Sequence, residues 1–140
     1  MTAAPRDPET LDQVQEDCSV AARAAWSKGG GDTVILAVGK VLAITDAFVI
    51  TSGNNPRMVR TIAEEVEAKV KAASARSPRS VEGLDDARWV LMDYGDFVVH
   101  IFLDEARDFY QFDRLWGDAE RWAWDGGSEA AASARLAAGE

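Results

Sequence analysis

The stretch of sequence that decides the fold is Arg88–Leu103, which reads RWVLMDYGDFVVHIFL. Two runs rich in β-branched and aromatic residues flank the tripeptide Tyr94-Gly95-Asp96, and a connection this short joins antiparallel strands. We therefore predict a hairpin of the strands Arg88–Tyr94 and Phe97–Leu103. Alternation divides the side chains of the second strand between one face with Phe97, Val99, Ile101 and Leu103 and another with Val98, His100 and Phe102.

Further strands are predicted upstream of the hairpin. Asp46–Thr51 (DAFVIT) is a β-rich run, and Thr33–Val38 is a continuous apolar run typical of a strand that is covered on both faces. Val41–Ile44 either prolongs that strand past a bulge or begins its return. The turn Ser52–Pro56 then leads into a helix, because Asn55 suits an N-cap and proline suits the first helical position.

Helices are predicted on both sides of these strands. Thr10 and Gln13 form a capping-box pattern, apolar residues recur at helical spacing as far as Ala25, and the glycines at 29–31 end the helix. Asp104 is expected to cap a short helix that runs through Tyr110. This order of elements predicts a small single α/β domain with a mixed β-sheet flanked by helices.

The length of 140 residues and the hydrophobic content of 47% fit one globular domain. We expect residues 1–9 to form a flexible arm, 10–117 the domain and 118–140 a disordered tail rich in Ala and Gly. Trp122 and Trp124 are unusual in such a tail, and the sequence offers no explanation for them other than docking onto the domain. No apolar stretch reaches the ~20 residues of a membrane span, so a soluble, cytoplasmic protein is expected.

The charge is acidic and unevenly distributed. The formal net charge is −9, and residues 82–120 carry three basic and eleven acidic side chains, a net charge of −8. Nucleic-acid binders rely on clustered Lys and Arg, so little direct contact with nucleic acid is expected. The acidic segment is either a solvated face or a docking surface for a basic partner.

The sequence offers little support for an enzyme. Ser52-Gly53 lacks the spacing of dinucleotide and phosphate-binding loops, the only histidine is His100, and the only cysteine is Cys18. Asp93 and Asp96 straddle a turn, where turn-stabilising caps are more common than a metal site. We therefore expect no catalytic residues, no metal and no cofactor. The alternative is a metal- or nucleotide-dependent transferase of nucleotidyltransferase-like fold that uses Ser52, Asp93 and Asp96.

Two blocks of the chain resemble the Iojap family of ribosomal silencing factors. One is Trp89–Phe102, continued by Glu105–Tyr110 (EARDFY) and Leu115-Trp116, and the other is Ile44–Gly53 (ITDAFVITSG). The two blocks occur in the family's order, and the resemblance runs from about residue 11 to 117. It implies a mixed sheet with a nucleotidyltransferase-like topology that lacks the catalytic residues.

The resemblance also implies a function without catalysis. Members of this family bind the large ribosomal subunit at its intersubunit face, through its protein fourteen, and so block joining of the small subunit when nutrients are scarce. A further alternative is a homodimer, in which the apolar face that would bind the ribosome pairs with the same face of a second copy. We expect the partner-binding face on the hairpin and the terminal helix, formed by the aromatic residues Trp89, Tyr94, Tyr110 and Trp116, the acidic residues Asp93, Asp96, Glu105 and Asp108, and His100.

Overall fold

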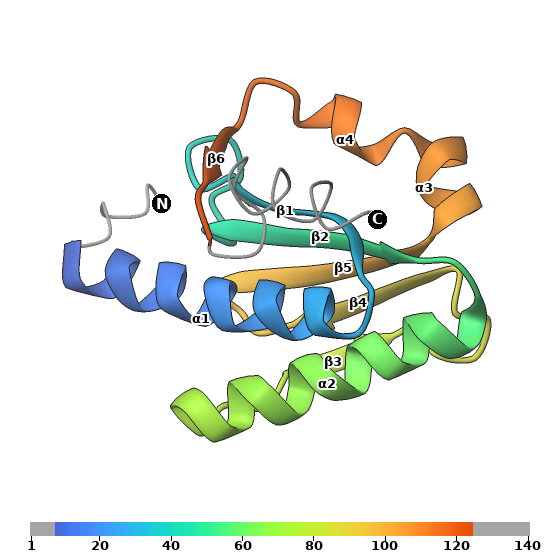
Figure 1. Cartoon of the computed structure of the whole chain (residues 1–140). Coiled ribbons are helices and arrows are strands. Elements are labelled where there is room, and N and C mark those ends of the chain that lie inside the picture. The colour runs from blue at the N-terminus through green and yellow to red at the C-terminus, as the bar shows by residue number, and fades with distance from the viewer. Residues whose placement is uncertain (1–7, 125–140) are drawn as a thin grey trace, which may run out of the picture.

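Six strands form one mixed sheet in the computed structural model, which describes residues 8–124 (Figure 1). Their order across the sheet is β3-β4-β5-β2-β1-β6. Helices accompany the sheet on both of its faces. In chain order the elements are α1 (Pro8–Ser27), β1 (Gly31–Ala37), β2 (Ala47–Gly53), α2 (Pro56–Ser74), β3 (Ser80–Glu82), β4 (Trp89–Asp93), β5 (Phe97–Leu103), α3 (Asp104–Tyr110), α4 (Phe112–Leu115) and β6 (Glu120–Trp122).

The centre of the sheet is the parallel pair β2 and β5. Their register runs from Ala47 opposite Phe97 to Gly53 opposite Leu103, and every residue of β2 is buried. The other neighbouring strands are antiparallel. β4 and β5 form the hairpin expected from the sequence, so the predicted α/β fold with a mixed, helix-flanked sheet is confirmed.

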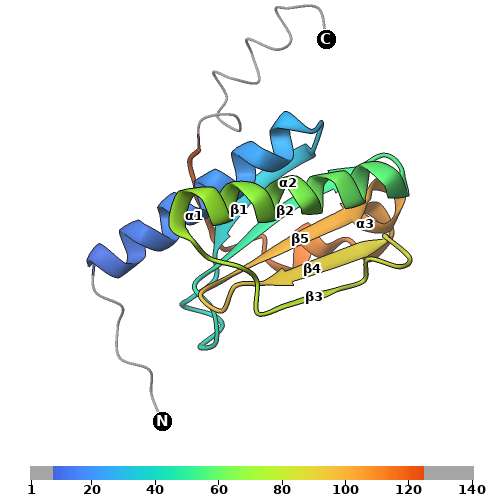
Figure 2. The same cartoon turned by 90° about the horizontal axis from the view of Figure 1, so that it is seen from below.

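The helices form two layers of different size. α1 and α2 cover one face of the sheet, and the short α3 and α4 cover the other (Figures 1 and 2). The larger apolar cluster lies under α1 and α2, with Val14, Ile62 and Phe97 among its buried members. A smaller and largely aromatic cluster lies on the other face, with Phe48 and Phe102 among its members. None of the helices within residues 8–124 is long and apolar enough to cross a membrane.

α2 begins and ends as its sequence requires. The Asn55 side chain accepts a hydrogen bond of 2.8 Å from the Met58 amide, which satisfies an N–H that has no helical partner, and Pro56 follows at the first position. The buried residues recur every three or four positions and lie against the sheet. They are Val59, Ile62, Ala63, Val66 and Val70.

The glycines after α1 allow the chain to reverse in a confined space. Gly29 has a φ of +86°, a conformation that glycine adopts without strain. A Cβ at Gly30 would lie 2.5 Å from the Thr51 hydroxyl oxygen and 2.8 Å from the Ala25 carbonyl oxygen. The predicted end of this helix is thus confirmed, and its start lies at Pro8, two residues before the predicted Thr10.

Three details of the predicted organisation are wrong. The domain does not end at residue 117, because β6 pairs with β1 and the buried Trp124 indole donates a hydrogen bond of 3.2 Å to the Thr33 carbonyl. Pro8 and Glu9 belong to α1, not to an arm. Val41–Ile44 belongs to no strand, since the Val38 and Gly39 amides bond to Asp46 across this loop. The remainder of the predicted arm and tail, 1–7 and 125–140, lies outside the described residues.

Arg76 joins three separate parts of the chain at one end of the sheet. Its guanidinium lies 3.0 Å from Asp17 of α1 and 2.7 Å from Asp96 in the β4–β5 turn, and it donates to the Tyr94 carbonyl. The Asp17 side chain is 2% exposed, and the Arg76 guanidinium is the cation that balances it. The hydrogen bonds with Asp96 raise the pKa of Arg76, which stays charged.

We expect Arg76→Met to lower the free energy of unfolding by about 3 kcal/mol, because it leaves the buried Asp17 carboxylate without its cation. Denaturant titration at pH 7 measures the change. Arg79→Met is the matched control, because this arginine is 72% exposed and lies 3.8 Å from Asp93. The control should cost less than about 1 kcal/mol. Equal losses in the two variants would show that the Arg76 cluster contributes no more than a surface pair.

Candidate docking surface

Arg107 fastens α3 to the sheet. Its side chain is buried, and it donates hydrogen bonds to the Gly31 carbonyl at 3.1 Å, the Asp32 carbonyl at 2.8 Å and the Ser52 hydroxyl at 3.3 Å. The β1–β2 register shifts between Gly31 and Val34, and Asp32 has a φ of +45°. The guanidinium therefore satisfies carbonyl groups at an irregular part of β1 and fixes the position of α3.

The start of α3 differs in one respect from the prediction. Leu103 occupies the N-cap position without a side-chain hydrogen bond, so Asp104 is the first helical residue and not the cap. Asp104 and Glu105 lie in the first turn, where negative charge is favoured by the helix dipole.

An aromatic layer fills the space between the sheet and α3–α4. The Phe48 ring lies 4.5 Å from His100 and 5.2 Å from Trp116, and Phe112 lies 4.8 Å from His100 (ring centroids). Trp89 stacks on Phe102 at 5.0 Å. Rings in such edge and stacked contacts stabilise a core beyond the area that they bury. This layer is the packing contact that holds α3 and α4 against the sheet.

His100 lies inside this layer and not on the surface. Its Nδ1 accepts a hydrogen bond of 3.1 Å from the Trp89 indole, which fixes the proton of the neutral ring on Nε2. Burial lowers the pKa of His100 to about 4. This buried position does not support the predicted role of His100 as a partner contact. It supports a structural role, in which His100 holds the Trp89 indole in place.

The outer side of α3 and α4 carries large apolar side chains in water. Phe109 is 76% exposed, Leu115 71% and Tyr110 46%. Glu105 and Asp108 are exposed on the same short helix. We call the set Glu105, Asp108, Phe109, Tyr110 and Leu115 the α3–α4 surface. It combines apolar anchors with acidic groups, as protein-docking surfaces do.

The structure brings together only some of the residues predicted for partner binding. Glu105, Asp108 and Tyr110 lie on the α3–α4 surface, while Trp89 and Trp116 are half-buried beneath it in the aromatic layer. Phe109 and Leu115 were not among the predicted residues. The signal for them was the number of large apolar residues between positions 109 and 116, because five such residues cannot all face one small core.

The other three predicted residues lie at the opposite end of β5 and have structural partners. Tyr94 is buried against Phe97, with ring centroids 4.6 Å apart, and burial raises its pKa to about 12. Asp93 accepts a hydrogen bond of 2.7 Å from the Gly95 amide in the turn, and Asp96 pairs with Arg76. The hairpin and the terminal helix therefore do not form one continuous docking face.

The alternative transferase site is contradicted by the strand register. Ser52 pairs with Phe102 near the end of β5, whereas Asp93 pairs with Val98 near its start. Four residues of strand separate the two levels, about 13 Å. The Ser52 hydroxyl bonds instead to Arg107 and to the Gly31 carbonyl. Within residues 8–124 no three His, Cys, Asp or Glu side chains come together as metal ligands.

Comparison with known proteins gives one consistent family. The family model described as "Ribosomal silencing factor during starvation" matches residues 11–139, which extends past residue 117, where the resemblance was expected to end. The chain is 37% identical over 100 residues to the ribosomal silencing factor RsfS of Bacillus subtilis, which covers 71% of this chain and 84% of the relative.

A solved structure and a mitochondrial relative agree with this result. A crystal structure of a protein from Chromobacterium violaceum superposes with a TM-score of 0.71 at 30% identity and covers 84% of this chain and 97% of that one. The mouse protein named "Mitochondrial assembly of ribosomal large subunit protein 1" is 31% identical over 87 residues, which is 61% of this chain and 38% of the relative.

The buried His100 makes stability depend on pH. An unfolded chain protonates this ring near pH 6.5, whereas the folded protein resists protonation down to about pH 4. As the pH falls below 6.5, the unfolded state binds the extra proton, so stability falls. Between pH 7.5 and pH 5 we expect His100 to account for a loss of about 2 kcal/mol.

His100→Asn tests this, because the amide oxygen can accept from Trp89 and does not titrate. Denaturant titrations give the free energy of unfolding of both proteins at pH 7.5 and at pH 5. The change between the two pH values is then compared for the variant and the parent protein. The variant should lose about 2 kcal/mol less than the parent protein between the two pH values. Identical losses would mean that another group carries the pH dependence.

We also expect Arg107→Met to loosen α3 selectively. The change removes the charged donor to the Gly31 and Asp32 carbonyls but keeps a long apolar stem, and a hydrogen bond from a charged donor contributes about 1.5–3 kcal/mol. Hydrogen exchange of the α3 amides should become at least about tenfold faster relative to those of β2. Uniform acceleration throughout the sheet would contradict a local role.

Proposed function

The chain belongs to the ribosomal silencing factor family, and we propose that it binds the large ribosomal subunit through the subunit's protein fourteen and blocks joining of the small subunit. Translation then falls when nutrients are limiting. The family match carries this proposal, and the name of the mouse mitochondrial relative supports the large subunit as the partner. The protein acts where ribosomes work, in the cytoplasm.

The proposed mechanism is steric and needs no chemical step. A domain of this length is about 30 Å across, which is enough to occupy part of the interface between two ribosomal subunits. Once seated there, the domain prevents the approach of the small subunit for as long as it stays bound. Its inhibitory strength therefore depends on the rate of dissociation.

We place the contact on the α3–α4 surface. Phe109 and Leu115 supply exposed apolar anchors, and burial of such side chains supplies most of the energy of a protein interface. Glu105 and Asp108 supply negative charge beside them. Ribosomal proteins are basic, so this arrangement is complementary to such a partner.

The charge of the whole chain also supports a basic ribosomal protein as the partner. The formal net charge is −9, and the phosphates of ribosomal RNA repel an acidic protein. A basic patch of ribosomal protein therefore attracts this chain, whereas the surrounding RNA repels it. Electrostatic attraction to this patch speeds the encounter, and repulsion elsewhere suppresses wrong positions.

A sucrose-gradient experiment tests the function directly. Purified large and small subunits are mixed with and without the protein, and the peak of joined ribosomes is measured. The peak should shrink in proportion to the amount of protein bound to the large subunit. A joined-ribosome peak of unchanged height, with the protein present in excess, would refute the proposal. Sedimentation of the free protein at two concentrations separates a homodimer from a monomer.

The docking surface is tested by the double variant Phe109→Ala and Leu115→Ala. Loss of two exposed anchors should weaken binding to the large subunit at least about tenfold without changing the melting temperature. Leu84→Ala is the control, because Leu84 is also exposed, at 41%, but lies between β3 and β4. Binding should also weaken as salt is raised. If the control variant loses as much affinity as the double variant, the contact lies elsewhere.

A further inference from the structure

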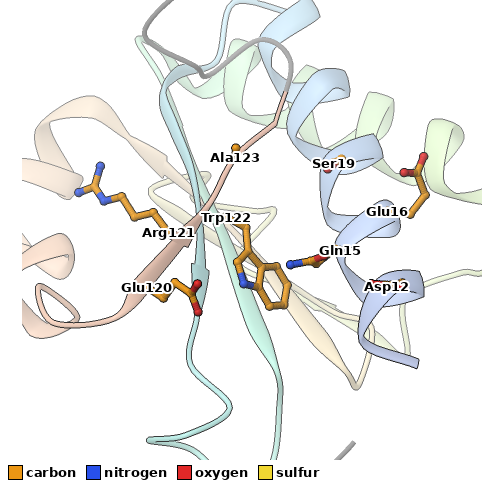
Figure 3. A pocket seen from close by; sticks show the side chains of 8 residues that line it. All are labelled: Asp12, Gln15, Glu16, Ser19, Glu120, Arg121, Trp122 and Ala123. Carbon is orange, nitrogen blue, oxygen red and sulfur yellow. The ribbon is translucent and has the colours of Figure 1, made fainter. Parts of the chain in front are cut away.

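A groove between α1 and β6 forms a second surface that the proposed function does not use. Its volume is about 470 Å³, and Figure 3 shows one wall formed by α1 and the other by β6. None of the residues of the α3–α4 surface lines it. The lining residues are Asp12, Gln15, Glu16, Ser19, Glu120, Arg121, Trp122 and Ala123.

One wall of the groove is a sheet edge. β6 is the last strand in the order β3-β4-β5-β2-β1-β6, and its register pairs Glu120 with Ala37 and Trp122 with Ile35. In the described part of the chain, no strand pairs with the other side of β6. Such an edge presents backbone N–H and C=O groups, which an extended peptide can use by adding one more strand.

The side chains around this edge select for positive charge. Asp12 and Glu16 are exposed on α1 and Glu120 is exposed on β6, so carboxylates stand on both walls. Arg121 is the single cationic side chain of the lining. The Glu16 side chain lies 3.8 Å from Arg23 and points away from Trp122 in Figure 3, so Asp12 is the α1 carboxylate that serves the groove.

An aromatic ring completes the groove. The half-buried Trp122 packs on the core beside α1, and in Figure 3 its indole projects between the two walls toward Gln15. An indole is the preferred ring for contact with a guanidinium or an ammonium group. Carboxylates, an indole and a strand edge together match one type of ligand, an extended peptide that carries Arg or Lys.

We propose that the groove between α1 and β6 binds an extended, Arg- or Lys-rich peptide segment of a partner protein, which pairs with β6 and places its cationic side chains near Asp12 and Glu120. This site does not depend on the proposed function. A nucleic acid is disfavoured by the carboxylates. A second copy of this chain is disfavoured by its own charge of −9.

Binding of a synthetic peptide to the full-length chain tests the proposal. The probe is an eight-residue peptide of alternating arginine and valine, and its affinity is measured by titration calorimetry at low salt. Asp12→Lys with Glu120→Lys should weaken binding at least tenfold. Glu64→Lys with Glu67→Lys is the control, because it makes the same charge change at exposed positions of α2. Equal loss in both double variants would overturn the site, because it would show attraction to net charge alone.

A second probe separates strand addition from charge attraction. The same peptide with N-methylated amides along one edge keeps its charge but cannot donate hydrogen bonds to β6. It should bind at least tenfold more weakly than the parent peptide, and the parent should shift the NMR signals of the 120–123 amides. Unchanged affinity on methylation, or binding without shifts at these amides, would overturn the proposal. Neither result bears on whether the α3–α4 surface binds the ribosome.

Discussion

The parallel pairing of β2 with β5 is the constraint on which the rest of the structure depends. Parallel strands cannot be joined by a tight turn, so the chain must cross over, and α2, β3 and β4 make this crossover. The same pairing brings Gly53 level with Leu103, so that the connection into α2 and the start of α3 lie at one end of the sheet. The turn at Tyr94–Asp96 must then lie at the other end.

This constraint also explains how the two ends of the sheet are used. At one end, Arg107 binds the irregular part of β1 and fixes α3. At the other end, Arg76 binds Asp17 and Asp96 and so joins α1 to the β4–β5 turn. Each end therefore has a buried or half-buried arginine that joins segments far apart in the sequence. With both ends held, the outer side of α3 and α4 is free to carry exposed apolar groups.

Local patterns in the sequence were sufficient for the hairpin, for α2 and for the end of α1, because turns, caps and glycines act on neighbouring residues. The parallel pair could be expected only as part of a mixed sheet, since its register depends on contacts across the whole chain. β6 was missed because Glu120–Trp122 is short and lies in a stretch of unfavourable composition. The predicted docking face failed for a geometric reason: Asp96 and Glu105 are close in sequence, but β5 carries the chain from one end of the sheet to the other.

The late position of β6 in the chain has a consequence for synthesis. β1 is finished at Ala37, but the strand that covers its outer side begins only at Glu120, about 80 residues later. At 5–20 residues per second, a ribosome takes roughly 4–16 s to make this interval. During that time the nascent chain exposes the apolar edge of β1, and open edges of this kind recruit other strands. The newly made protein is therefore prone to aggregation until Glu120–Trp122 has been synthesised and covers β1.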